Sequence, residues 1–226
     1  MILRHVFDLY QQGETIPALV ILFSEIFVIF CCLPVHEFAH AWTAYRLGDD
    51  TARLQGRLTL SPMRHLDPFG LALMLIAGFG YAKPVPVNIR NFKNRKRDFA
   101  LVSLAGPLSN LLMSLLFFII SNVLDLFPRI YVCAVMSIFF YYIGYINVSL
   151  AVFNLLPIPP LDGSRILGLI IPDKYYYTIL QYERYIRYAL LLLIFAGAFS
   201  NVLSTLTDWV SNGVEFVAYL PFRFFG

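Results

Sequence analysis

The chain has 226 residues, of which 59% are apolar and only 14% are charged. Soluble domains carry about 25% charged residues, so this composition argues against a soluble globular protein. The mean hydropathy of +0.69 likewise favours a membrane protein. The length suits one domain of roughly four to six spanning helices at about 20 residues each. The cysteines lie in apolar runs without a CxxC spacing, so no disulfide framework is indicated.

The first long apolar segment, residues 17–47, is predicted to be a membrane-spanning helix. As a straight helix it would be about 46 Å long, which exceeds the hydrocarbon core of roughly 30 Å. A tilt, or a bend at Pro34, which cannot donate a backbone hydrogen bond, would absorb the excess. Three further spans are predicted at residues 99–124, 131–153 and 189–207, and residues 214–226 are expected to lie at an interface.

Between the first two spans, the sequence predicts a short membrane-associated β region. Residues 52–60 alternate between polar and apolar side chains, which is the pattern of a half-buried strand. Residues 82–89 alternate again, but Pro84 and Pro86 restrict them to an edge strand. The apolar segment 69–80 is too short to span and suits an interfacial or re-entrant piece. The predicted fold class is therefore an all-α polytopic membrane protein with about four long transmembrane helices and a short β-hairpin or re-entrant region.

The positive charges predict how this single domain (residues 1–226, core 17–207) is oriented in the membrane. Residues 46–97 hold ten of the 17 lysines and arginines, and residues 161–187 hold four. The positive-inside rule places both loops in the cytoplasm of a multi-pass cell-membrane protein. The basic run at 90–97 could contact nucleic acid. Beside a span, however, it favours a loop near anionic lipid of the bilayer, and no nucleic-acid partner is expected.

The motif HEFAH, residues 36–40, lies near the end of the first predicted span. Residues four apart share a face of a helix, so His36 and His40 can bind one zinc ion. Glu37 beside them can take a proton from the attacking water. Ionisable side chains at membrane depth are costly unless they are paired or functional. The alternative is a polar patch satisfied by neighbouring helices. The predicted exit at Leu47 puts His40 on the order of 10 Å below the cytoplasmic surface.

A catalytic zinc ion usually has three protein ligands and one open position. The other histidines are His5 and His65, so a carboxylate is a candidate for the third ligand. Asp162 lies in the proline-rich stretch NLLPIPPLDG, at the cytoplasmic end of the third predicted span. The prolines end the helix and Gly163 permits a tight turn, so Asp162 can point back towards a metal ion. The alternative is an ordinary turn aspartate.

Five motifs follow one another along the chain: HEFAHAW, HLDPFG, YAKPVPVN, AGPLSN and NLLPIPPLDG. Together they resemble the site-2 protease family of intramembrane zinc metalloproteases, in its compact bacterial form without a PDZ or CBS domain. The resemblance covers residues 17–207. It implies one zinc ion (Zn2+) held by His36, His40 and Asp162, with Glu37 as general base. It also implies transmembrane proteins as substrates, cut within or near the bilayer.

Three further residues are candidates for substrate binding. Asn110 and Asn154 lie in two of these motifs, where each amide could hold an unwound substrate strand or the oxyanion. The alternative for both is hydrogen bonding between helices. His65 could assist at the site, or it could be a loop histidine without a role. The predicted strand at 52–60 could clamp an extended substrate by β-augmentation, or it could be a surface ribbon.

Three other functions stay open at this point. A transporter or a non-proteolytic metal-binding protein would place ionisable residues in a file across the bilayer, whereas here the polar groups gather around His36, His40 and Asp162. An inactive scaffold that only holds substrates would have no use for Glu37. Another membrane zincin would normally take its third ligand from a different motif, so the zinc content after Asp162→Ala separates the two.

Overall fold

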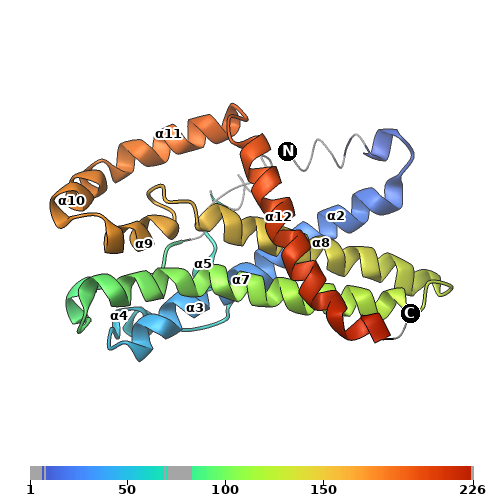
Figure 1. Cartoon of the computed structure of the whole chain (residues 1–226), viewed down its shortest axis with the longest axis horizontal. Coiled ribbons are helices and arrows are strands. Elements are labelled where there is room, and N and C mark those ends of the chain that lie inside the picture. Colours follow the sequence, from blue (N-terminus) through green and yellow to red (C-terminus); the bar gives the residue numbers. More distant parts are fainter. Residues whose placement is uncertain (1–6, 8, 69, 71–82, 225–226) are drawn as a thin grey trace.

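The computed structural model describes residues 7, 9–68, 70 and 83–224 (Figure 1). Over this part of the chain the regular structure is helical and no strand is found. Its main helices are α2 (Thr15–Phe27), α3 (Leu33–Arg46), α7 (Arg95–Asp125), α8 (Tyr131–Asn154) and α12 (Ser200–Tyr219). α7 packs against α3, α8 and α12, and α2 packs against α8. α7 is thus the central helix of the bundle.

The first predicted span is confirmed as a helix long and apolar enough to cross a membrane, Thr15–Arg46. α2 continues through a π-helical turn, η1 (Val28–Cys32), into α3, and the N–H of Leu33 bonds the carbonyl of Val28. Pro34 follows directly. It has no N–H for the carbonyl four residues back, and its ring crowds that carbonyl. The wider π turn accommodates this without ending the helix.

α7 and α8 form a helical hairpin, and they confirm the second and third predicted spans as membrane-length apolar helices. The start of α7 is capped by Asn94, whose side-chain oxygen accepts the N–H of Arg97 at 3.2 Å. Between the two helices, the ring of Phe118 lies over Gly144, where an added Cβ would come within 2.7 Å of the ring. The glycine therefore permits the close approach of α8 to α7.

The predicted fourth span at residues 189–207 is wrong as a single helix. α11 (Glu183–Phe195) ends before Gly197, which has a φ of +73°. The N–H groups of Gly197 and Ala198 bond carbonyls in the last turn of α11, as in the Schellman motif that ends helices at glycine. α12 then begins at Ser200 and packs its apolar side chains against α7 and α8. Three helices of the described ranges are therefore long and apolar enough to cross a membrane.

The predicted strand at residues 52–60 is also wrong. The chain forms α4 (Thr51–Leu54), turns at Gly56 with a φ of +65°, and then forms α5 (Pro62–His65). Asp49 begins the first of these turns, because its Oδ1 accepts both the N–H and the hydroxyl of Thr51, at 3.1 and 2.5 Å. An aspartate that bonds the backbone two residues on favours a helical start over an extended strand.

The predicted β-hairpin is not found in the described part of the chain. Of the expected edge strand at 82–89, residues 83–88 form neither helix nor strand, and the short helix η2 (Ile89–Asn91) follows. Its expected partner, residues 52–60, is not a strand, so no ladder is available. The segment 69–80, predicted to be interfacial or re-entrant, lies outside the described residues apart from Gly70.

Asp49 joins the end of α3 to the start of η2. Its buried carboxylate accepts the backbone N–H of Asn88 and the side-chain amide of Asn91, each at 2.7 Å. Burial by itself raises the pKa of the Asp49 carboxyl, but these hydrogen bonds and those from Thr51 outweigh it. They hold the pKa below its ordinary value. The carboxylate therefore fixes the loop that follows the first span.

The two loops rich in lysine and arginine share one end of the bundle (Figure 1). The first carries α4 and the start of α7, and the second carries α9 (Gly163–Ile170) and α10 (Asp173–Gln181). The short turn between α7 and α8 lies at the opposite end (Figure 1). This arrangement is the one that the positive-inside interpretation of the sequence requires.

Candidate active site

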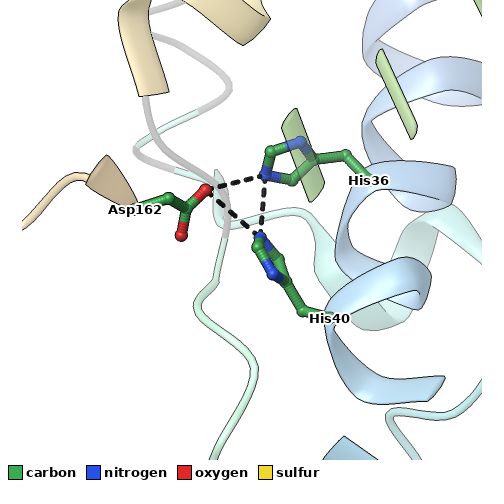
Figure 2. Close-up of side chains that lie close together, drawn as sticks. All are labelled: His36, His40 and Asp162. Atoms are coloured by element: carbon green, nitrogen blue, oxygen red, sulfur yellow. Dashed lines mark hydrogen bonds and ion pairs between the residues drawn. The ribbon is translucent and has the colours of Figure 1, made fainter. Parts of the chain in front are cut away.

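His36 and His40 lie one turn apart on α3, and their rings both face Asp162 (Figure 2). Their Nε2 atoms are 3.0 Å apart. The two residues are only 4% and 7% exposed. They therefore lie buried within a helix that is apolar enough to span a membrane, where ionisable groups are rare and usually functional.

Asp162 reaches this pair from the loop that follows α8. Its Oδ2 lies 3.5 Å from Nε2 of His36 and 3.3 Å from Nε2 of His40. The next residue, Gly163, begins α9, and a Cβ there would lie 2.1 Å from the carbonyl oxygen of Leu155. Only glycine lets the chain fold back this tightly on the end of α8, which is how Asp162 is brought over the histidines.

The surroundings of Asp162 favour its ionised form. Burial alone raises the pKa of its carboxyl group. The positive charge of His40 and the hydrogen bonds with both imidazoles outweigh this and hold the pKa well below its usual range. Asp162 is therefore an ionised carboxylate that lies beside Nε2 of His36 and Nε2 of His40.

The orientation of His40 is set by α7. Its Nδ1 donates to the carbonyl oxygen of Val102 at 2.7 Å, so Nε2, which faces Asp162, is the ring nitrogen available to a metal ion. Histidines that bind metals usually make such a second contact with their other nitrogen. Pro107 lies inside α7 just beyond this point. Because proline lacks an N–H, the backbone hydrogen bonding of α7 is interrupted beside the site.

Gly106 of α7 lies directly against both imidazoles. A Cβ at this position would come within 2.3 Å of Nε2 of His40 and 2.6 Å of Cε1 of His36. Real Cβ atoms do not approach other atoms this closely, so either ring would have to move. The glycine of the AGPLSN motif is therefore required by the packing of α7 on α3.

The three donor atoms have the spacing that a tetrahedral zinc ion requires. With bonds of about 2.05 Å, two ligand atoms of such an ion lie roughly 3.3 Å apart. The observed separations are 3.0, 3.3 and 3.5 Å. Two imidazoles and a carboxylate, with the fourth position open, are the donor set of a catalytic zinc ion. His36, His40 and Asp162 therefore fit a zinc ion, and the structure gathers their donor atoms within 4.8 Å of one another.

Glu37 follows His36 on α3 and is 8% exposed. A buried residue that the sequence did not indicate, Arg57, acts on it electrostatically. Burial lowers the pKa of Arg57, and the negative charge of Glu37 partly offsets this by raising it. The guanidinium donates to the carbonyl oxygen of Pro84 at 3.2 Å and to that of Lys83. In the sequence Arg57 is one polar residue of an alternating segment, and nothing there distinguishes it from a solvent-facing arginine.

His65 is fully buried in the loop that contains Arg57. Its Nε2 donates to the carbonyl oxygen of Thr59 at 2.7 Å, and its Nδ1 faces a guanidinium nitrogen of Arg57 at 3.4 Å. Both ring nitrogens therefore have partners within the loop. The structure places His65 beside Arg57, and it is not one of the grouped donors.

The two asparagines occupy different places. Asn154 is the half-buried last residue of α8, and its Nδ2 donates to the carbonyl oxygen of Leu150 at 3.0 Å. It thus begins the loop that carries Asp162. Asn110 lies inside the bundle, 1% exposed, one turn along α7 from Gly106. Among the described residues, neither the oxygen nor the nitrogen of its amide has a hydrogen-bond partner.

A bundle of long apolar helices around a buried zinc-type donor group is the arrangement of a membrane metalloprotease, and comparison with known proteins agrees. The sequence profile of peptidase family M50 matches residues 24–136 and 129–197. The chain therefore belongs to peptidase family M50, the site-2 protease family, and it is a multi-pass membrane zinc metalloprotease. The resemblance seen in the motifs is confirmed.

Three curated relatives illustrate the similarity. "Putative zinc metalloprotease YwhC" of Bacillus subtilis (strain 168) is 42% identical over 180 residues, which cover 78% of this chain and 80% of that protein. "Putative zinc metalloprotease Rip2" of Mycobacterium tuberculosis (strain Erdman) is 35% identical over 167 residues, 70% of this chain and 62% of Rip2. "Zinc metalloprotease MJ0392" of Methanocaldococcus jannaschii is 24% identical over 162 residues, 70% of this chain and 37% of that protein. No solved structure matches the chain.

Proposed function

We propose that the protein is an intramembrane endopeptidase that cuts transmembrane segments of other membrane proteins, as in regulated intramembrane proteolysis. One zinc ion is held by His36, His40 and Asp162, and Glu37 is the general base. The observation that carries the proposal is the close grouping of these three donors inside a bundle of membrane-length apolar helices.

The proposed site lies near the cytoplasmic side of the cell membrane. His40 is six residues before Arg46, the last residue of α3. At 1.5 Å per residue it lies about 9 Å from the end of that helix. The lysine-rich and arginine-rich loops share this end of the bundle, which supports a cytoplasmic assignment (Figure 1). A substrate would therefore be cut just below the headgroups of the cytoplasmic leaflet.

A zinc ion bound here supplies Lewis-acid polarisation of the scissile carbonyl and lowers the pKa of the attacking water. The carboxylate of Glu37 accepts a proton from that water and returns it to the leaving amine. His40 is kept in the tautomer with its proton on Nδ1 by the carbonyl of Val102, so that Nε2 stays free to bind. Arg57 supplies a buried positive charge near Glu37.

The substrate must unwind before it can be cut, because a helix buries its carbonyl groups in its own hydrogen bonds. In lipid, each backbone group left unpaired costs several kcal/mol. Asn154 begins the loop that carries Asp162. We propose that its amide forms hydrogen bonds with the backbone of the unwound substrate. His65 and Asn110 are buried, and we assign them to support of the site from within the protein.

The variant Glu37→Gln tests the proposal, because it removes the base and leaves all three metal ligands in place. Membrane proteomes of cells that express wild type or Glu37→Gln are compared, with zinc content measured on the purified proteins. We expect equal zinc content, and fragments of transmembrane proteins in the wild-type cells alone. Equal cleavage by both proteins would remove Glu37 from the proposed role. Zinc-loaded wild type without any cleavage product would favour a metal-binding protein or a transporter.

A further inference from the structure

One face of α7 turns polar side chains into the bundle beside the proposed zinc site. Ser103, Gly106, Asn110 and Ser114 follow one another at helical spacing, and all four are buried. Three of their polar atoms have no hydrogen-bond partner among the described residues: Oδ1 and Nδ2 of Asn110 and Oγ of Ser114. Buried polar groups of this kind are normally bonded to protein or to ordered water, so these require an explanation.

One of the two proposed ligand histidines, His36, also has an unpartnered nitrogen among the described residues. Nδ1 of His36 is buried and has no hydrogen-bond partner in the part of the chain that the structure describes, whereas Nδ1 of His40 donates to the carbonyl of Val102. Histidines that bind metals are held by a second contact through the nitrogen that does not face the metal. His40 has this contact, and among the residues that the structure describes His36 has none.

Asn110 lies on the face of α7 that meets the ring of His36. A Cβ on Gly106 would lie 2.6 Å from Cε1 of His36, the carbon that lies between Nδ1 and Nε2. Asn110 is four residues after Gly106, on the same face of α7. Side chains on a helix lean over the turn that precedes them. The amide of Asn110 therefore leans back over Gly106, on the face of α7 that meets the two imidazoles.

We propose that Asn110 is a positioning residue for the metal site: its Oδ1 holds the Nδ1 proton of His36 through one buried water, which would give both unpartnered atoms a hydrogen bond. This inference rests on the proposed zinc site. It makes α7 the support of both ligand histidines, through positions four residues on either side of Gly106. Val102 holds His40 by its backbone, and Asn110 holds His36 by its side chain. Ser114, one turn further on, can satisfy a bridging water or the Asn110 amide.

Zinc affinity of the purified full-length protein in detergent tests this role without relying on activity. Apo protein competes for zinc with a chelating indicator, and the cobalt-substituted protein reports ligand geometry through its visible spectrum. Asn110→Leu keeps the size of the side chain and removes the acceptor. Asn110→Asp keeps an acceptor at the same place. Ser121→Ala is the matched control, because Ser121 is buried further along α7, where it bonds to Ser137.

We expect Asn110→Leu to bind zinc roughly 10–100-fold more weakly than wild type, with a changed cobalt spectrum. Asn110→Asp and Ser121→Ala should stay close to wild type. If Asn110→Leu does not fold, Asn110→Ala replaces it in the same comparison. Wild-type affinity and an unchanged spectrum in the variant without an acceptor, or an equal loss in Asn110→Asp, would overturn the inference. If the wild type binds no zinc, the proposed zinc site itself is refuted.

Discussion

Gly106 faces the metal-binding edge of His40 so closely that a Cβ there would lie 2.3 Å from Nε2 of the imidazole. α7 can therefore pack on this face of α3 only if position 106 has no side chain. The same nitrogen lies 3.3 Å from Oδ2 of Asp162. The helix–helix contact and the spacing of the donor atoms are thus coupled at one residue.

Gly106→Ala should consequently damage the metal site. The added methyl group must displace an imidazole or separate the helices, and overpacking of this kind costs about 1–3 kcal/mol of stability. We expect weaker zinc binding, loss of cleavage and a lower unfolding temperature in detergent. Gly213→Ala in α12 is the control, because a Cβ there meets nothing within 4 Å. Unchanged zinc affinity in Gly106→Ala would contradict the coupling.

Arg57 should matter for cleavage more than for metal binding. Its guanidinium bonds two carbonyl oxygens and acts on Glu37, and lysine cannot reproduce the fork of donors. Hydrogen bonds from charged groups are worth about 1.5–3 kcal/mol. We therefore expect Arg57→Lys and Arg57→Gln to cleave a reconstituted substrate roughly 10–100-fold more slowly, with full zinc content.

Arg53→Gln controls for the loss of a loop arginine. Arg53 lies in the same segment as Arg57, but its side chain is half exposed and pairs with Asp50 at 2.9 Å. Exposed pairs of this kind contribute little. Cleavage by Arg53→Gln should stay near wild type. If Arg57→Gln also cleaves at the wild-type rate, the proposed influence of Arg57 on the site is excluded.

Asp49→Asn should destabilise the protein in a pH-dependent way. Both carboxylate oxygens of Asp49 accept hydrogen bonds, so the NH2 group of an asparagine would face a hydrogen-bond donor. The lost hydrogen bond should lower the free energy of unfolding by about 1–3 kcal/mol. The pKa of Asp49 is held below its ordinary value of 3.8, so its contribution is complete above that value and is lost as the pH falls through the folded-state pKa. Thermal unfolding should show a constant deficit from about pH 7 to about pH 5 that shrinks below the ordinary pKa. A deficit independent of pH would contradict this origin.

The part of the site that lies on one helix was accessible from sequence. The spacing of His36 and His40 requires a common face once α3 is helical, and an apolar span makes their burial expensive unless they have a function. The approach of Asp162 depends instead on how the loop after α8 folds back over α3, through the close contact of Gly163 with Leu155. Spacing along the chain contains no information on that contact. The loop sequence made Asp162 a candidate and left a turn aspartate as the alternative, and it was the family resemblance that favoured the ligand.

The failures of prediction have local causes. Residues 52–60 alternate as a strand does, but the hydrogen bonds from Thr51 to Asp49 begin a helical turn there. Residues 189–207 are apolar enough for a span, but Gly197 adopts a positive φ and ends α11. Arg57 was overlooked because its burial depends on carbonyls 26 and 27 residues away. In each case one side-chain or backbone contact outweighed a periodic pattern.

The zinc content of folded, full-length protein tests the central claim most directly. Elemental analysis compares the wild type with Asp162→Asn, which keeps the shape of the side chain and removes its charge, and with Asp50→Asn on the exposed loop. We predict about one zinc ion per chain in the wild type and in Asp50→Asn. Asp162→Asn should lose its zinc to a weak chelator. A wild type without stoichiometric zinc, or an Asp162→Asn variant that holds zinc as firmly as the wild type, would contradict the account.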